Sequence, residues 1–322
     1  MNTVVPIHFE QALTAAIQAP SPHNTQPWRF GVDTEQIDLW LERDRILTVA
    51  DPDAAEARLS CGAALLNLTL SLRVQGHLPV MHLLPQTDQP DLLAMIRIDG
   101  KCKPSHTERS LAAAIAARHT NRRPFLEQPV AAQARSALAS SATADGGRLE
   151  YLDASGHYDD VATLVRHAEF LQESDQRFRA ETAHWMHRTA ASRDGIPMTA
   201  QGPPPQSAGA VTLRESHTNK ALPARPYEQE PLLAAVLTHA QGPRADLQAG
   251  MIMQRVLLTA TSIGLATGFL SQPFETPGTR TALDHLFGDL GHIHALLRIG
   301  YGTPVPTTAR RPVSEVSIPR SQ

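Results

Sequence analysis

The chain has 322 residues, a formal net charge of −3 and 42% hydrophobic residues, which is enough for a large core in two domains or one duplicated domain. The near-neutral charge gives no overall basic field for nucleic acid or an anionic membrane, so a small molecule is the expected partner. Only Cys61 and Cys102 are present, which disfavours a disulfide framework or zinc ribbon and suits a reducing compartment. Without a signal-like N-terminus or a membrane-length apolar stretch, we expect a cytoplasmic protein.

The first half of the chain combines predicted helices with an antiparallel pattern of strands. The loop at 19–27 separates a helix expected at about 8–18 from two alternating runs, WRFGVD and QIDLWLE, which predict a β-hairpin. A long apolar helix is expected over about 54–75, followed by short strands at PVMHLL and LAMIRID. A further helix is expected to end just before Arg118.

The second half contains predicted helices near 129–140, 156–183 and 244–263 and strands at GRLEYLD, GFLSQ and IHALLRIG. Helices and antiparallel strands are mixed without a regular βαβ alternation, which favours the α+β class over a doubly wound parallel sheet. Residues 187–230 are rich in Pro, Gly and polar residues and lack an apolar period, so they are expected to leave the core. A segment of this kind is either a functional lid or a disordered linker, and we favour a lid.

The two longest predicted helices share an internal repeat. The interval from Gly62 to Gly76 equals that from Gly250 to Gly264, and each runs from a small residue inside the helix to a glycine at its end. Two such helices could cross closely at a pseudo-two-fold axis, as in a dimer interface fused into one chain. On this pattern alone, coincidence between two ordinary amphipathic helices is an equally good interpretation.

A polar loop, APSPHNTQPWRF, joins the first helix to the hairpin. Prolines stiffen the loop around Ser21, His23, Asn24 and Gln26, and an indole follows directly. Such a loop suits a flat heteroaromatic ligand. By its composition alone, however, a turn that caps its neighbours is the better interpretation.

A basic segment, RHTNRRPF, begins at Arg118, where the second half of the chain would start. The hydroxyl of Thr120 lies between the guanidinium groups of Arg118 and Arg122, a pattern that suits a phosphate dianion because guanidinium groups form charge-assisted, often bidentate bonds. The common alternative for an isolated basic run is a solvated or nucleic-acid-facing patch.

The loop motif APSxxNxQPW resembles the N-terminal signature of the nitroreductase superfamily of FMN-dependent oxidoreductases. Those proteins are usually homodimers with two FMN sites at the subunit interface, and an RxSxR-type segment near the start of each subunit binds the phosphate. This chain has no such segment before residue 19 and carries one at 118–122. The order of RxTNRxPF, a WMHR helix end and RDGIP at 193–197 resembles the Acg branch. The resemblance implies two fused halves, 1–115 and 116–322, with one complete FMN site.

The resemblance also implies cofactor contacts in the second half. The segment SIGLATGFLSQP looks like the one whose backbone N–H reaches flavin N5, near Ser271 by spacing. A basic residue at TTARRP, either Arg310 or Arg311, would return to the phosphate, unless each belongs to a disordered tail. The full set of predicted cofactor-binding residues is Pro20, Ser21, His23, Asn24, Gln26, Arg118, His119, Thr120, Arg122, Leu270, Ser271, Gln272, Arg310 and Arg311.

The implied function is NAD(P)H-dependent two-electron reduction of a small electron acceptor such as a quinone or nitroaromatic. Because the flavin would do the chemistry, we expect no catalytic side chain, and the sequence indicates no metal site. One chain suffices for one FMN, and further oligomerisation stays open. The alternative is a flavin-sequestering protein without turnover, in which residues 187–230 cover the isoalloxazine and exclude nicotinamide and substrate.

Overall fold

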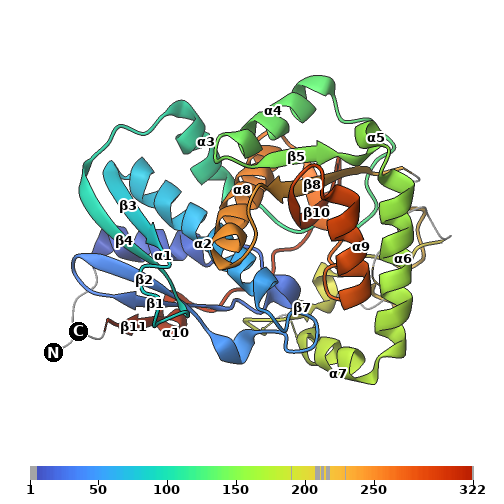
Figure 1. The fold of residues 1–322 in the computed structure, drawn as a ribbon, viewed down its shortest axis with the longest axis horizontal. Helices are drawn as coiled ribbons and strands as arrows, with labels where there is room; N and C mark the ends of the chain where they lie inside the picture. Colours follow the sequence, from blue (N-terminus) through green and yellow to red (C-terminus); the bar gives the residue numbers. More distant parts are fainter. Residues whose placement is uncertain are drawn as a thin grey trace.

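The computed structural model describes residues 6–189, 191–206, 211, 214, 218–228 and 230–320. Two sheets lie on either side of a pair of long central helices, α2 (Ala55–Val74) and α8 (Pro243–Ser262), as Figure 1 shows. All strand pairs within the two sheets are antiparallel except for the parallel pairing of the C-terminal strand with β1. The predicted α+β class is therefore confirmed.

The first sheet has the strand order β11-β1-β2-β4-β3. Its elements, with the helices around it, are α1 (Ile7–Ala16), η1 (Pro22–Asn24), β1 (Trp28–Val32), β2 (Gln36–Leu41), η2 (Arg43–Arg45), β3 (His77–Leu83), β4 (Leu92–Lys101), α3 (His106–Ala114), α10 (Val313–Val316) and β11 (Ser317–Pro319). The predicted hairpin is thus present, and β11 brings the end of the described chain back to β1.

The second sheet has the strand order β5-β8-β10-β9. Its elements and neighbours are α4 (Ala132–Thr143), β5 (Arg148–Tyr151), α5 (Leu152–Ser155), α6 (Tyr158–Ser174), α7 (Gln176–Trp185), β6 (Met186–Arg188), β7 (Ile196–Pro197), η3 (Met198–Ala200), β8 (Leu232–Thr238), β9 (Ala266–Phe269), α9 (Pro277–Phe287) and β10 (His292–Gly300). In Figure 1, α6 lies on the outer side of this sheet, away from the first sheet.

The two sheets repeat one topology. The series α1-β1-β2-α2-β3-β4 corresponds in order to α4-β5-β8-α8-β9-β10, and the strand orders β1-β2-β4-β3 and β5-β8-β10-β9 correspond as well. The largest difference lies between the first two strands of each series. A short turn at 33–35 joins β1 to β2, whereas α5, α6, α7, β6, β7 and η3 all lie between β5 and β8.

The crossing of α2 and α8 is equally symmetric. A Cβ at Gly62 would lie 2.1 Å from the carbonyl oxygen of Leu247, and a Cβ at Gly250 would lie 2.0 Å from that of Leu59. Each glycine therefore fits against the backbone of the other helix, where no side chain can be placed. Gly76 and Gly264, the glycines predicted at the ends of the two helices, have left-handed φ angles of 88° and 80°. Such angles are typical of a glycine that terminates a helix.

One predicted helix is wrong. The expected single helix at 156–183 is divided into α6 and α7 at Asp175. Asp175 has a non-helical ψ of 113°, and its carboxylate accepts hydrogen bonds from the backbone N–H groups of Arg177 and Phe178. Asp175 therefore caps the start of α7, a competition between side chain and helix that hydrophobic periodicity does not report.

No helix in the described residues is both long enough and apolar enough to cross a membrane.

Candidate cofactor-binding site

The APSPHNTQPW loop and the RHTNR segment meet in the folded chain. Pro20, Ser21, Thr120 and Arg122 line both a central cavity and a smaller cavity beside it. Of Asn24, Gln26 and Ser271, which were predicted to hold the flavin ring, Ser271 lines the central cavity, as do His23, Leu270 and Gln272. Arg118, Thr120 and Arg122, which were predicted to hold the phosphate, line the smaller cavity. The additional predicted residues in the smaller cavity are Asn24, His119 and Arg310.

The loop before β1 has an unusual backbone. His23, Asn24 and Gln26 have positive φ angles of 46°, 59° and 53°, a region in which non-glycine residues are uncommon. The Ser21 hydroxyl accepts a hydrogen bond of 2.9 Å from the Gln26 backbone N–H and so holds the loop in this shape. Strained conformations of this kind persist where the surroundings fix them, and they concentrate at functional sites.

Three arginines converge at the smaller cavity without an acidic partner. Among the described residues, no carboxylate forms a hydrogen bond or ion pair with Arg118, Arg122 or Arg310. Arg118 is 3% exposed, and its guanidinium donates to the Gln18 carbonyl, while its Nε and Nη1 have no partner among the described residues. Arg310 donates to the carbonyls of Thr308, Ala309 and Ala19, with Nε left over.

These arginines also oppose one another electrostatically. Burial, followed by the charges of Arg310 and Arg122, lowers the pKa of Arg118 to about 9. Burial likewise lowers the pKa of Arg122 and of Arg310 to about 10. Clustered, poorly solvated cations with unused donors form a receptor for an anion with several oxygens, because each guanidinium can then form charge-assisted hydrogen bonds.

The segment after β9 forms another wall of the central cavity. The Leu270 N–H is occupied by the Leu296 carbonyl at 3.1 Å, which extends the pairing of β9 with β10. The backbone N–H of Ser271 donates to no acceptor in the part of the chain that the structure describes. The chain thus presents an unused backbone donor at the position where sequence reasoning expected a flavin contact.

Comparison with known proteins identifies the chain. No family model matches it. A Mycobacterium tuberculosis protein named "Putative NAD(P)H nitroreductase Rv3131" is 32% identical over 329 residues, which cover 98% of this chain and 93% of that protein. The chain belongs to the nitroreductase family.

A second relative of this nitroreductase, from the same organism, is "Putative NAD(P)H nitroreductase acg", 30% identical over 314 residues that cover 96% of this chain and 94% of the relative. The predicted membership of the superfamily's Acg branch is therefore confirmed. Solved structures that resemble the chain include FMN-bound nitroreductases from Desulfovibrio desulfuricans (TM-score 0.38, 13% identity, covering 64% of this chain and 93% of that one) and Desulfitobacterium hafniense (0.39, 12%, 64% and 95%).

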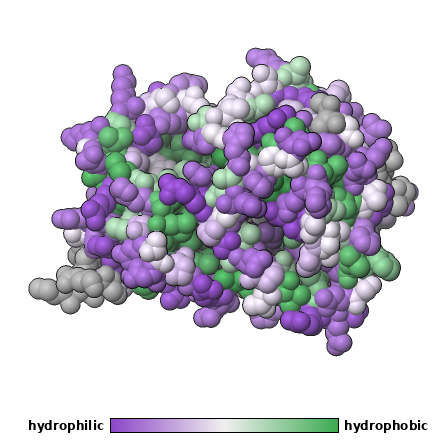
Figure 2. Space-filling model, viewed as in Figure 1, coloured by the Kyte–Doolittle hydropathy of each residue, from purple (hydrophilic) through white to green (hydrophobic). Residues whose placement is uncertain are grey.

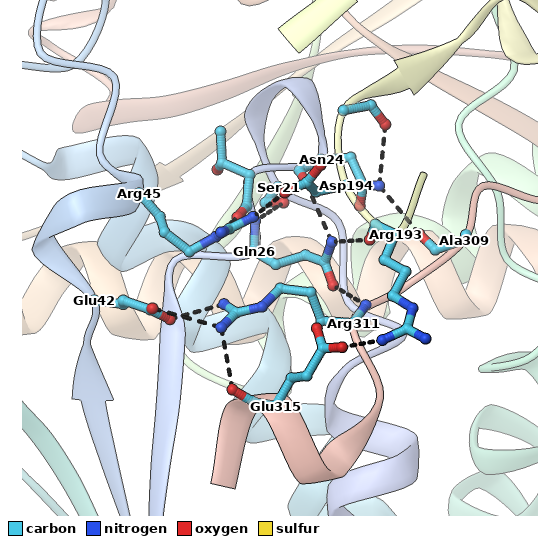
Figure 3. Close-up of polar contacts among 12 residues, drawn as sticks. Ser21, Asn24, Gln26, Glu42, Arg45, Arg193, Asp194, Ala309, Arg311 and Glu315 are labelled. Atoms are coloured by element: carbon cyan, nitrogen blue, oxygen red, sulfur yellow. Dashed lines mark hydrogen bonds and ion pairs between the residues drawn. The ribbon is translucent and has the colours of Figure 1, made fainter. Parts of the chain in front are cut away.

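Two predicted residues, Gln26 and Arg311, lie outside the cavity walls of this nitroreductase. Figure 3 shows them bonded to each other and to the chain around them. The Gln26 side chain accepts from the Arg311 N–H at 2.8 Å and donates to the Arg193 carbonyl at 2.8 Å. The Arg311 guanidinium pairs with Glu42 at 2.8 Å. Of the two alternatives at the C-terminal arginines, the structure thus places Arg310 at the cavity and commits Arg311 to an ion pair elsewhere.

The Asn24 amide is also committed to the protein, although it lines the smaller cavity. Its Nδ2 donates to the carbonyls of Gly195 and Ala309 at 3.1 Å each, while its buried Oδ1 has no partner in the residues that the structure describes. Asn24 and Gln26 together bind the backbone of the 187–230 segment to the loop before β1. The polar composition of the loop therefore serves partly to hold this segment in place.

Sequence reasoning missed three charged residues in the wall of the central cavity: Glu56, Arg214 and Arg298. The Arg214 guanidinium pairs with Glu275 at 2.6 Å, and Arg298 forms a buried ion pair with Glu228 and lies over the Phe125 ring. Within the described part of the chain, each of these guanidinium groups keeps at least one nitrogen without a hydrogen-bond partner. For Arg298 a signal was available in the sequence, since a charged residue in the apolar run IHALLRIG must be buried with a partner.

Proposed function

We propose that this nitroreductase binds one FMN and reduces small electron acceptors, quinones or nitroaromatics, with electrons from NADH or NADPH. The observation that carries the proposal is the cluster of buried Arg118 with partly buried Arg122 and Arg310, which has no carboxylate partner among the described residues. A ribityl phosphate would supply the missing charge, and the adjoining central cavity would take the ring. When bound, FMN supplies the two-electron chemistry.

The residues present fit this cofactor at both ends. Arg118 and Arg310 have unused nitrogens at the smaller cavity, and Thr120, which lines both cavities, adds a hydroxyl donor. At the other end the unused Ser271 N–H is a fixed donor for a flavin ring nitrogen, a contact that stabilises electron density there. In this proposal the chain holds and orients the cofactor through Arg118, Arg122, Arg310 and Ser271.

We further propose that the chain arose from two fused nitroreductase-like halves, 1–115 and 116–322, that together retain one site. The repeated strand order and the reciprocal fit of Gly62 and Gly250 support this. The APSPHNTQPW loop occurs only in the first half and the RHTNR segment only at the start of the second. A single combination of the two therefore remains, and one FMN per chain is expected.

The test is to purify the protein with FMN present, release the flavin by denaturation and count it per chain. The bound flavin should bleach anaerobically on addition of NADH or NADPH and recover on addition of a quinone. A flavin content near two per chain would refute the fused-halves proposal. Absence of any FMN affinity would refute the proposed function as a whole.

A second candidate function, flavin storage with little turnover, is favoured by the position of the described part of 187–230. Ile196, Arg214 and Thr218 line the cavities, and the segment is fastened by the Asp194–Arg45 ion pair of 2.6 Å. A Cβ at Gly202 would lie 1.9 Å from the Arg122 carbonyl oxygen, so the segment packs directly on the RHTNR backbone. The remainder of the expected lid, 190, 207–210, 212–213, 215–217 and 229, lies outside the described residues.

The two functions differ in how fast nicotinamide can reduce the bound flavin. Hydride transfer requires close stacking of nicotinamide on the flavin, so a fastened cover slows it while leaving the oxidised spectrum unchanged. Reduction of the wild type by NADH or NADPH within seconds supports the oxidoreductase. Reduction by dithionite but by neither nicotinamide supports storage.

A further inference from the structure

Glu56 is a carboxyl group in the wall of the central cavity that the proposed FMN contacts leave unused. It lies in the first turn of α2, one turn before Leu59 and Ser60, which line the same cavity. Its Oε2 atom is buried, and no hydrogen-bond partner for it exists within the described residues. A buried polar atom without a partner costs about 1–3 kcal/mol of stability, so its presence beside a ligand cavity calls for a functional reason.

Acidic groups from two directions surround Glu56. Asp51 precedes α2 and accepts hydrogen bonds from the backbone N–H groups of Glu56 and Ala57, while Glu275 precedes α9. Burial, followed by the charges of Glu275 and Asp51, raises the pKa of the Glu56 carboxyl well above its usual range. An uncharged, protonated carboxyl is the form that this environment favours.

Basic groups also face Glu56, and each of them forms an ion pair with another carboxylate. Arg214 and Arg280 act to lower the pKa of Glu56. Arg214 is paired with Glu275 at 2.6 Å, and Arg280 is paired with Asp284 at 3.1 Å. The other ionisable groups in the cavity wall are His23, Arg122, His294 and Arg298.

We propose that Glu56 is the proton donor to the electron acceptor. The substrates of this site are therefore electron acceptors that must take up a proton when they are reduced. The inference rests on the proposed function. A quinone that receives a hydride equivalent from the reduced cofactor needs one further proton to become a hydroquinone, and Glu56 gives that proton from its carboxyl oxygen. A nitro group that receives the same hydride equivalent and one proton is converted to a nitroso group and water. The Glu56 carboxylate then regains its proton from solvent.

The test compares two acceptors on the FMN-loaded protein. The flavin is reduced photochemically, without nicotinamide, and then mixed with 1,4-benzoquinone or with ferricyanide, which accepts electrons and no proton. Glu56→Gln keeps the shape of a protonated glutamate and removes its acidity. Reoxidation by the quinone should slow roughly 10²-fold or more and lose its pH dependence, whereas reoxidation by ferricyanide should be unchanged.

The pH profile of the wild type should follow the donor. Quinone reduction should be fast while Glu56 is protonated and should fall as the pH rises through its raised pKa. Glu10→Gln, a substitution at an exposed carboxylate in the first turn of α1, is the matched control and should keep the wild-type profile. Glu56→Asp keeps the acid and should restore part of the rate and the pH dependence.

An infrared spectrum of the oxidised protein at neutral pH gives an independent readout. The carbonyl stretch of a protonated carboxylic acid should be present in the wild type and lost in Glu56→Gln. Three results would overturn the role of Glu56 and leave the proposed function intact. They are an infrared band that is the same in both proteins, equal slowing with both acceptors, and a quinone pH profile that the substitution does not change. A wild type that ferricyanide reoxidises and no quinone or nitroaromatic does would instead overturn the proposed function.

Discussion

Replacing Arg118 with glutamine should have opposite effects on the cofactor-free protein and on FMN binding. The lowered pKa of Arg118, about 9, means that the folded protein disfavours the charged guanidinium. This cost is fully present at every pH below about 9 and declines progressively as the pH rises from there towards the ordinary pKa of arginine. A neutral glutamine removes the cost at pH 7, so the apoprotein of Arg118→Gln should unfold at a higher temperature than wild type.

FMN binding should weaken in the same variant. Arg118 has two unpartnered nitrogens, and one charged hydrogen bond contributes about 1.5–3 kcal/mol, or about 10- to 150-fold in Kd. We expect a loss within this range, because Arg122 and Arg310 remain to share the phosphate. Titration of the apoprotein by flavin fluorescence at pH 7 measures the Kd of FMN and of riboflavin, which lacks the phosphate and should bind almost as before.

Arg311→Gln is the matched control, since its guanidinium pairs with Glu42 and does not line a cavity. It should leave the ratio of FMN to riboflavin affinity unchanged. If Arg118→Gln weakens both ligands equally, Arg118 supports the fold and does not bind phosphate, and the interpretation of the arginine cluster is wrong.

Three further predictions concern pH, the cover and the helix crossing. The affinity of the wild type for FMN should fall as the pH rises above about 9, because Arg118 in the cofactor-free protein then loses the proton that gives it the positive charge needed to bind phosphate. The fall should be smaller in Arg118→Gln when both proteins are titrated across that range. Asp194→Asn breaks the ion pair with Arg45 and should speed the reduction of bound flavin by NADPH, measured by stopped flow. Arg193→Ala breaks an exposed ion pair with Glu315 and should not change this rate. Equal rates in the wild type and both variants would argue against a cover. Gly62→Ala should lower the free energy of unfolding, measured by urea denaturation, by about 3 kcal/mol, because the new Cβ meets the Leu247 carbonyl. Gly278→Ala, with open space around the added Cβ, should lower it little. Similar losses in the two variants would refute the close helix crossing.

The elements that the sequence predicted well are those with a strong local signal. The helices expected at 54–75 and 244–263 correspond to α2 and α8 within a residue or two at each end, because apolar periodicity and a terminal glycine mark both. Sequence reasoning assigned no element to β8, which is buried along almost its whole length and therefore shows no alternation of apolar and polar residues. It also missed α9 and the short pairing of β11 with β1.

The candidate site was predictable only where a compact motif carried it. The loop at 19–27 and the segment at 118–122 could be recognised, but their composition did not tell which side chains point into a cavity. Gln26 and Arg311 bind each other because the C-terminal segment returns past the loop, a long-range contact with no local signature. Glu56 in a helical first turn has the sequence pattern of a solvated carboxylate, and neither its burial nor the approach of Glu275, more than 200 residues away, has a local signature.

The path of the last described residues has a consequence for how the protein is made. The chain leaves β10 in the second sheet, passes the smaller cavity at Arg310 and ends with β11 beside β1 of the first sheet. Ribosomes make the N-terminal part of a protein first, so Arg118, Arg122 and strands β1 to β4 are synthesised before this strap. The anion receptor therefore acquires its third guanidinium only after the strap has been made. A nascent chain that has not yet reached Arg310 should hold the cofactor less tightly than the folded protein.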